Sequence, residues 1–356
     1  MSKVYFVRAE NADGIEANTG RLERLLGESG VLRPAGAGSR VAVKMHFGEE
    51  GNTGFVRPAF LRIICSGLCA QGAEPFISDT NTLYRGRRMN SADHLALARE
   101  HGFSRRGCGA EAVIPDETKG ENIAAVEVNK KFIRKAKILK LFLEADFLLG
   151  VAHFKGHMMT GFGGALKNIG MGCASREGKL AQHCDVSPLI YKGNCIGCGK
   201  CAEVCPAQAI ILNGDKAGLE RQKCIGCASC IAACAFGAID VEWASGAGDI
   251  QEKMAEYAYA VLAAKKNKSA FINFALKITK ECDCLAKDDP AIAPDIGIFA
   301  SGDPVAIDKA CLDLINAACG KDIFREAHPQ RDGMKQLRWA QQLGLGSVDY
   351  SLVEIK

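Results

Sequence analysis

The sequence lacks the features that mark membrane, secreted and nucleic-acid-binding proteins. No apolar run approaches the roughly 18 residues that a membrane-spanning helix needs. The first residues, MSKVYFVRAENADG, contain no long apolar stretch after their single lysine, which argues against a signal peptide. The formal net charge of +4 over 356 residues is too small to indicate binding to nucleic acid or to a membrane surface. These absences predict a cytoplasmic protein without nucleic-acid or membrane partners.

Cysteine, in contrast, is abundant, with 17 in the chain. Eight of them form two arrays, CIGCGKCAEVCP and CIGCASCIAACA, each with the spacing C-x-x-C-x-x-C-x-x-x-C. The arrays begin at Cys195 and Cys224, and each cysteine of the second array lies 29 positions after its counterpart in the first (224 − 195 = 29). This constant offset indicates an internal duplication.

The spacing is the one that bacterial ferredoxins with two 4Fe–4S clusters use, in which the fourth cysteine of an array binds the other array's cluster. We therefore expect two 4Fe–4S clusters as cofactors, the first held by Cys195, Cys198, Cys201 and Cys234 and the second by Cys205, Cys224, Cys227 and Cys230. Ala235 stands where a proline usually follows the last cysteine, but that proline is not a ligand. A zinc ribbon spaces its cysteine pairs further apart, and disulfides need an oxidising compartment.

The chain is longer than a single core normally supports, so two domains are expected. Strand-like segments precede the arrays and resume after them, at residues 3–9, 40–46, 74–79, 147–153, 270–278, 296–301 and 350–355. Helix-like segments alternate with them, which is typical of a parallel sheet covered by helices.

The predicted fold class is therefore α/β, a mostly parallel sheet with helices on both faces, plus an inserted small α+β ferredoxin-like domain. The α/β domain would be discontinuous, comprising residues 1–187 and 244–356, and the two-cluster insert would comprise residues 188–243. Short strands on either side of the arrays are expected to pair and to bring the two ends of the insert together.

Polar, glycine-rich sequence follows three of the predicted strands, in KMHFGEEGNTGF, SDTNTLYRGRR and HFKGHMMTGFGGALKN. Because parallel strands present such loops at one edge of the sheet, we expect a ligand site there. The candidates for catalysis are His153, His157, Lys167 and Asp79, and those for binding a ligand are Lys44, His46, Lys167 and Asn168. Their charges, with free amides at the start of the following helix, suit an anionic or metal-bound ligand. The alternative is a tight glycine turn packed beneath the insert.

Two further groups have the composition of metal sites. His153 and His157 are four residues apart, a metal-ligand spacing in a helix, although a strand precedes them and Gly156 lies between them. Cys282 and Cys284 bracket an acidic residue and, together with Cys173 or a histidine, could hold an additional metal. The alternative for Cys282 and Cys284 is a pair of ordinary buried thiols.

In HFKGHMMTGFGGALKNIGMGC, DTNTLYRGRR, CDC and SGDPVAID, the chain resembles uncharacterised iron–sulfur centre proteins that carry domain of unknown function 362. Such proteins come mostly from anaerobic bacteria and archaea, and the similarity covers nearly the whole chain. The resemblance implies an α/β domain with a ferredoxin insert at this place and supplies no established reaction. The motif positions are His46, Asp79, Asn81, His153, His157, Lys167, Asn168, Cys282, Cys284, Asp303 and Asp308.

These features together predict an iron–sulfur redox protein that transfers electrons to or from a ligand or partner at the α/β domain. It would be an oxidoreductase or the electron-transfer subunit of one, and its partner a redox protein or a small anionic ligand. Two alternatives stay open: a pure electron carrier with a docking domain, and a protein that handles a metal or cofactor. Cluster potentials in proteins span about −700 to +450 mV, so the cysteine spacing does not set the direction of electron flow.

Overall fold

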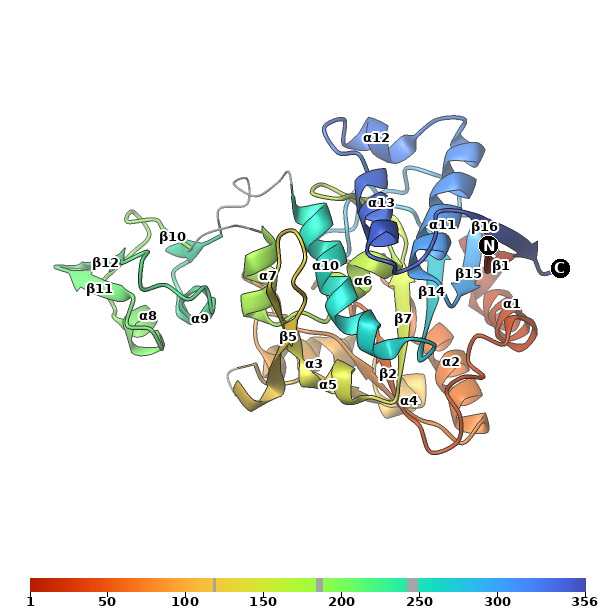
Figure 1. Ribbon diagram of the computed structural model, residues 1–356, viewed down its shortest axis with the longest axis horizontal. Helices are drawn as coiled ribbons and strands as arrows, with labels where there is room; N and C mark the ends of the chain where they lie inside the picture. The colour runs from red at the N-terminus through yellow and green to blue at the C-terminus, as the bar shows by residue number, and fades with distance from the viewer. Residues whose placement is uncertain (118–119, 184–187, 242–248) are drawn as a thin grey trace.

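The computed structural model of the chain describes residues 1–117, 120–183, 188–241 and 249–356. At the centre of the described residues lies an eight-stranded sheet in the order β16-β1-β15-β14-β7-β2-β3-β4 (Figure 1). Its strands are β1 (Ser2–Arg8), β2 (Arg40–Lys44), β3 (Glu74–Ser78), β4 (Glu111–Val113), β7 (Phe147–His153), β14 (Ser269–Ala275), β15 (Gly297–Ser301) and β16 (Tyr350–Glu354). In this sheet β15 is antiparallel to both of its neighbours, and all other neighbouring pairs are parallel. The mostly parallel sheet is confirmed.

The strands that precede the predicted loops are neighbours in the sheet. Strands β14, β7, β2 and β3 lie side by side and parallel, so their carboxyl ends meet at one edge. From β2 the chain continues outward to β3 and β4, whereas from β7 it continues in the opposite direction to β14. The strand order therefore reverses between β2 and β7. Open parallel sheets bind their ligands beside such a reversal, at the carboxyl ends of the strands.

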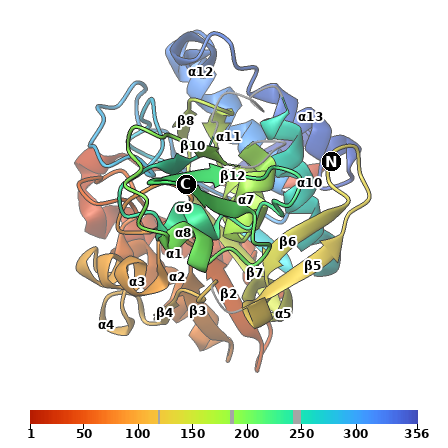
Figure 2. The ribbon, with the colours of Figure 1, turned by 90° about the vertical axis from the view of Figure 1, so that its left-hand side faces the viewer.

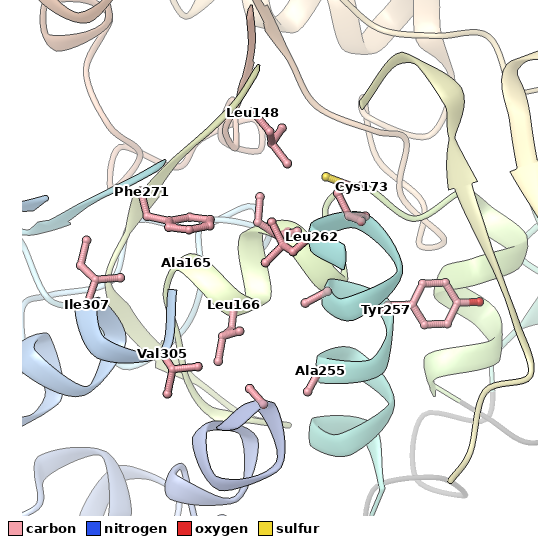
Figure 3. Packing of buried hydrophobic residues seen from close by; sticks show 14 of the residues in the cluster. Leu148, Ala165, Leu166, Cys173, Ala255, Tyr257, Leu262, Phe271, Val305 and Ile307 are labelled. Carbon is pink, nitrogen blue, oxygen red and sulfur yellow. The ribbon is translucent and has the colours of Figure 1, made fainter. Parts of the chain in front are cut away.

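Helices cover both faces of the sheet, as predicted. One face packs against α1 (Gly14–Ser29), α2 (Pro58–Ala70), α3 (Ser91–Glu100) and α4 (Arg105–Cys108). The other packs against α5 (Lys140–Glu144), α6 (Ala165–Gly170), α10 (Ile250–Leu262), α11 (Pro304–Cys319), α12 (Ile323–Ala327) and α13 (Met334–Gln342). Successive side chains of β7 alternate between the two layers: Leu149 and Val151 join the first, and Leu148 joins the second. Figure 3 shows Leu148 in the same cluster of buried side chains as Leu166 and Leu262, in the second layer. Burial on both faces explains why β7 is apolar along most of its length.

The two cysteine arrays form a small lobe beside the α/β domain, drawn in green in Figures 1 and 2. It contains β10 (Leu189–Ile190), α8 (Lys200–Glu203), β11 (Ile210–Asn213), β12 (Lys216–Leu219), α9 (Ser229–Ala233) and β13 (Ile239–Asp240). Strands β10 and β13 flank the arrays and pair antiparallel, Leu189 opposite Asp240 and Ile190 opposite Ile239. The ends of the segment are thus adjacent, as the sequence predicts. The predicted domain boundaries fall at positions 187, 243 and 244, which lie outside the described residues.

The loop after β3 belongs to the α/β domain and contacts this lobe. Arg85 Nη2 donates a hydrogen bond of 2.6 Å to the carbonyl oxygen of Ala235, the residue that follows Cys234. Leu83 belongs to the same apolar cluster as Cys195, Cys201, Cys230 and Cys234. Leu180 of α7 (Arg176–His183) also joins that cluster. The lobe therefore packs against the edge of the sheet at which β3 ends.

The remaining described elements are two small hairpins and three short 3₁₀ turns. Strand β5 (Ile123–Glu127) pairs with β6 (Lys135–Leu139), and β8 (Lys155–His157) pairs with β9 (Gly161–Gly163). The 3₁₀ turns span Asn11–Asp13, Gly120–Asn122 and Ala263–Lys265. Within the described ranges, no helix is both long enough and apolar enough to cross a membrane.

Strand β2 ends at Lys44, two residues before the predicted end at His46. The N–H of Met45 still donates to the carbonyl oxygen of Ser78 on β3, at 3.1 Å. The chain then turns away, because Nδ1 of His46 accepts a hydrogen bond of 2.9 Å from the N–H of Gly48. This turn directs the loop after β2 over the edge of the sheet.

Candidate functional site

A cavity of about 390 Å³ opens at the carboxyl edge of the sheet, with walls from the segments that follow β2, β3, β7 and β14. Its lining includes all the predicted candidates of this edge: Lys44, His46, Asp79, His153, His157, Lys167, Asn168, Cys282 and Cys284. The motif positions Asn81, Asp303 and Asp308 are not among its lining residues. Four segments that are far apart in the sequence are thus brought together beside the reversal in strand order.

One wall of the cavity is a buried network of charges. Nζ of Lys44 lies 3.0 Å from Oδ1 of Asp79, and Nη1 of Arg88 lies 3.6 Å from Oδ2 of the same carboxylate. Nε of Arg88 also lies 3.1 Å from Oε2 of Glu49. The exposed fractions of these side chains are 1 to 4%. Burial alone would raise the pKa of Asp79, but the charges of Lys44 and Arg88 outweigh it and lower the pKa to about 2. Asp79 is therefore an ionised anchor for two cations and is poorly suited to act as a general acid.

A second wall is built around Asp283, the acid between the two cysteines. Its Oδ1 lies 2.9 Å from Nδ1 of His153, and its Oδ2 lies 3.5 Å from Nζ of Lys155. Burial would raise the pKa of Asp283, but the charges of these two partners hold it well below its usual range. Nε2 of His153 lies 2.9 Å from the carbonyl oxygen of Leu276. Because oxygen atoms face both ring nitrogens, His153 positions Asp283 and offers no nitrogen to a metal ion in this arrangement.

Asn168 and His46 also have their polar atoms engaged by the protein. Oδ1 of Asn168 accepts from Nζ of Lys44 at 3.0 Å, and Nδ2 donates to the carbonyl oxygens of Lys44 and Val151. Nε2 of His46 lies 2.7 Å from Nη1 of Arg88. Burial and the charge of Arg88 hold the pKa of His46 well below its usual range. These two side chains therefore orient Lys44 and Arg88 toward the cavity.

Lys167 differs from the other cations, because its ammonium group makes no hydrogen bond or ion pair within the described residues. Burial, reinforced by the charge of Lys155, lowers the pKa of Lys167 to about 7. Lys179 lies in the same lining and donates to the hydroxyl of Thr80 and to the carbonyl oxygen of Ala174. Lys167 is therefore the ammonium group best placed to meet an anionic ligand.

The amides at the start of α6 are not available to such a ligand, contrary to the expectation from the sequence. Asp308 accepts hydrogen bonds from the N–H groups of Ala165 and Leu166, at 2.7 and 3.0 Å, and from Nδ2 of Asn273. Burial raises the pKa of Asp308 to about 6, although these donors oppose the shift. A protein carboxylate thus occupies the position that an anion would take at the helix N-terminus. Asp303 plays a similar capping role at the start of α11.

The glycines of the segment between β7 and α6 serve close packing. A Cβ on Gly156 would lie 2.2 Å from the carbonyl oxygen of Lys280, and a Cβ on Gly164 would lie 2.2 Å from Oδ1 of Asp308. The predicted glycine turn is therefore present, but it packs within the α/β domain and not beneath the insert. The charge of the cavity comes from side chains, and the glycines let the loops that carry them approach one another.

Outside this cavity, the eight array cysteines gather around two small cavities in the lobe. Cys195, Cys198, Cys201 and Cys234 line one, and Cys205, Cys224, Cys227 and Cys230 line the other. The fourth cysteine of each array thus lies with the first three of the other array, which is the predicted crossover. Backbone N–H groups also point at the sulfurs: Ala217 donates to Cys195, Ala209 to Cys205 and Ala238 to Cys234, at 3.2 to 3.3 Å. Four thiols around each cavity are the donor set that a 4Fe–4S cluster requires.

Cys282 and Cys284 lie in the wall of the larger cavity and are joined by a disulfide. A ring nitrogen of His157 lies within 4.8 Å of both sulfurs, so the three side chains form a group with metal-binding chemistry when the thiols are reduced. Cys173, the other predicted companion, lies in the apolar core beneath α10 and is not part of this group. His153 and His157 do not share a metal site here, because the nitrogens of His153 face protein oxygens.

The sequence analysis missed Arg88 and Lys179. Both are nearly buried and line the cavity, and Arg88 contacts four polar side chains, those of Glu49, His46, Tyr84 and Asp79. The sequence offered one signal for Arg88, its place in the polar loop SDTNTLYRGRR after β3. Nothing in the sequence around Lys179 distinguishes it from a solvated lysine on a helix.

Comparison with known proteins places the chain in a family. The model of the family described as Domain of unknown function (DUF362) matches residues 41–313. A search of curated protein sequences finds no match.

Two solved structures show similarity. The lactate racemase apoprotein from Thermoanaerobacterium thermosaccharolyticum is 16% identical, with a TM-score of 0.38, over 78% of this chain and 51% of that chain. A structural-genomics protein from Thermotoga maritima is 15% identical, with a TM-score of 0.40, over 85% of this chain and 58% of that chain. The match thus spans little more than half the length of either protein, and neither likeness informs the chemistry of the cavity. Residues 41–313 make up 273 of the 356 positions, so the chain belongs to the DUF362 family.

Proposed function

We propose that this chain is an iron–sulfur redox protein that exchanges electrons with a ligand in the cavity of its α/β domain or with a partner protein. The observation that carries the proposal is the sorting of the eight array cysteines into two sets of four around two cavities, with one cysteine exchanged between the arrays. Each set would hold one 4Fe–4S cluster, which supplies one-electron transfer when bound. Residues 188–243 would then be a two-cluster ferredoxin-like domain inserted into an oxidoreductase or an electron-transfer subunit.

Small anionic molecules are the ligand class that the cavity favours. Five basic side chains line it, those of Lys44, Arg88, Lys155, Lys167 and Lys179, against the carboxylates of Asp79 and Glu281. Lys44 and Arg88 are neutralised by Asp79 and Glu49, and Lys155 by Asp283. Lys167 keeps an unbalanced charge, which an anionic ligand would neutralise.

The lobe has exposed apolar side chains to which a partner protein would bind. Large apolar side chains that are more than a third exposed gather there, namely Tyr191, Ile196, Val204, Ile211, Leu212, Ile225 and Phe236. Exposed apolar side chains gathered on one small region are typical of a protein-binding surface. This observation favours a partner protein that binds the lobe and delivers electrons to it. The electrons would then pass to a ligand in the cavity of the α/β domain.

The test of the proposal is the metal content of protein purified without oxygen. We expect about eight iron atoms and about eight acid-labile sulfides per chain, with the electron paramagnetic resonance signals of reduced 4Fe–4S clusters after addition of dithionite. Anaerobic preparations that contain zinc in place of iron would contradict it, because zinc has no redox chemistry.

The lowered pKa of Lys167 predicts that anion binding in the cavity depends on pH. Sulfate is a suitable probe, because it keeps its charge between pH 6 and 8. The pKa of Lys167, about 7, means that the side chain is a cation below that pH and neutral above it. Sulfate affinity is therefore expected to fall as the pH rises through 7, measured by isothermal titration calorimetry. In Lys167→Met the affinity should be lower at pH 6, and it should change much less between pH 6 and 7 than in wild type, because the pKa of the neighbouring Lys179 is about 8. The matched control is Lys266→Met, an exposed lysine outside the cavity. An unchanged profile in Lys167→Met would contradict the assignment.

A further inference from the structure

The only disulfide among the described cysteines lies in the wall of the cation-lined cavity. It joins Cys282 and Cys284, whose Cα atoms are 5.3 Å apart. The other described cysteines, including the eight of the arrays, are free thiols. Clusters bound by thiolates persist under reducing conditions, in which a purely structural disulfide is disfavoured. A pair that closes under such conditions is typically a reversible one.

The bond contributes little to the stability of the fold. It closes a loop with one intervening residue, Asp283, and so short a loop restricts the unfolded chain far less than a long one. Other contacts hold the loop in place. The carboxylate of Asp283 is paired with His153 and Lys155, and its carbonyl oxygen accepts from the N–H of Glu49 at 3.0 Å. Opening the bond therefore leaves both sulfurs in position to close again.

The surroundings of the sulfurs suit a thiolate. A ring nitrogen of His157 lies within 4.8 Å of both sulfurs. Nδ1 of His157 accepts a hydrogen bond from the N–H of Met159, so the neutral ring carries its proton on Nε2, which can donate to a thiolate. Lys155 and Lys167 line the same cavity and favour negative charge there. Cys284 is only partly buried, so water can supply protons through the open cavity.

The cavity is also connected to the lobe that carries the arrays. Leu83 lines the cavity and belongs to the apolar cluster around Cys195, Cys201 and Cys234. Two residues further on, Arg85 donates to the carbonyl oxygen of Ala235, beside Cys234. One short loop thus contacts both the disulfide-bearing cavity and the residues around the first set of four cysteines.

We propose that Cys282 and Cys284 are a two-electron disulfide–dithiol couple that takes up or gives off the electrons carried by the clusters. This inference rests on the proposed function and names the acceptor group within the same site. In the reducing direction the sulfur–sulfur bond breaks, and two electrons and two protons yield two thiols. The reduced clusters supply one electron each, and water in the cavity supplies the protons. In the oxidising direction, the dithiol returns both electrons.

The test is a reductive titration of anaerobically purified protein loaded with both clusters. Wild type is expected to take up about four electrons per chain from dithionite, two for the clusters and two for the disulfide. The Cys282→Ser/Cys284→Ser variant should take up about two. Alkylation followed by mass spectrometry should show both cysteines of the wild-type peptide blocked before the titration and modified after it. The matched control is Cys69→Ser, which removes an exposed free thiol on α2 and should leave the count at about four.

The possible results of this titration distinguish a failure of the disulfide–dithiol couple from a failure of the proposed function. Equal electron uptake by wild type and double variant, with about eight iron atoms in each, would overturn the couple and leave the iron–sulfur proposal standing. Wild-type protein without iron would overturn both. Stoichiometric binding of zinc by Cys282, Cys284 and His157, with no difference in electron uptake, would assign the group to a metal site and overturn the couple.

Discussion

Replacing Cys205 with alanine is expected to remove the cluster of Cys224, Cys227 and Cys230 and to spare the cluster of its own array. The reason is geometric, because Cys205 lines the cavity of the second array and Cys234 lines that of the first. The iron content should fall from about eight to about four atoms per chain. Iron analysis and electron paramagnetic resonance of anaerobically prepared protein measure this loss. Cys69→Ala, which removes an exposed cysteine outside both arrays, should retain all the iron.

Double variants identify which cluster is lost. Cys205→Ala combined with Cys227→Ala removes two ligands of one proposed cluster, so about four iron atoms should remain. Cys205→Ala combined with Cys201→Ala removes a ligand from each, so almost no iron should remain. The reverse pattern would mean that Cys205 completes the cluster of Cys195, Cys198 and Cys201. The crossover would then be wrong, although the two-cluster proposal would survive.

Replacing Asp79 with asparagine is expected to lower the free energy of unfolding of the α/β domain by about 3–5 kcal/mol. The carboxylate lies 3.0 Å from Nζ of Lys44 and 3.6 Å from Nη1 of Arg88, and its side chain is 4% exposed. Asparagine has nearly the same shape but no charge, so the variant leaves Lys44 buried without a counter-ion. Removing one member of a buried ion pair is costly for that reason, even where the intact pair contributes little.

The measurement is urea denaturation followed by circular dichroism. The matched control is Glu111→Gln, which removes the carboxylate of an exposed ion pair with Arg105 and should leave the midpoint almost unchanged. A loss well below 1 kcal/mol in Asp79→Asn would mean that water in the cavity solvates Lys44 and Arg88, since a solvated pair behaves like one at the surface. The network would then be a binding surface and not part of the framework.

The fold could be predicted wherever a strand is buried on both faces and ends in polar residues. FLLGVAH is such a segment, and β7 spans the predicted residues Phe147–His153. The orientation of β15 could not be predicted, because Gly297–Ser301 is also buried throughout. The sequence of a strand that is buried on both faces contains no pattern that distinguishes a parallel from an antiparallel strand. Only its pairing with β1 and β14 makes it antiparallel.

In the candidate site, too, features that depend on residues close together in the sequence could be predicted, and features that depend on distant residues could not. The grouping of the array cysteines follows from spacing within a short segment, and the structure brings the same sets of four together. The occupied start of α6 could not be foreseen, because its capping residue, Asp308, lies more than 140 positions further along the chain. Arg88 was missed for a related reason. An arginine in a polar loop is normally solvated, and its burial here depends on Glu49 and His46, which come from the segment after β2.

The position of β1 also affects the order in which the chain can assemble during synthesis. The partners of β1 in the sheet are β15 and β16, which begin at Gly297 and Tyr350. A growing chain adds about 5–20 residues per second, so β1 waits about 15–60 s before residue 297 exists. The last cysteine of the arrays, Cys234, is synthesised 63 positions before Gly297 (297 − 234 = 63). If the chain binds the proposed clusters, their assembly could begin while β1 is still without its neighbours in the sheet. A protein that binds the exposed edges of β1 during this interval would protect it from pairing with another chain.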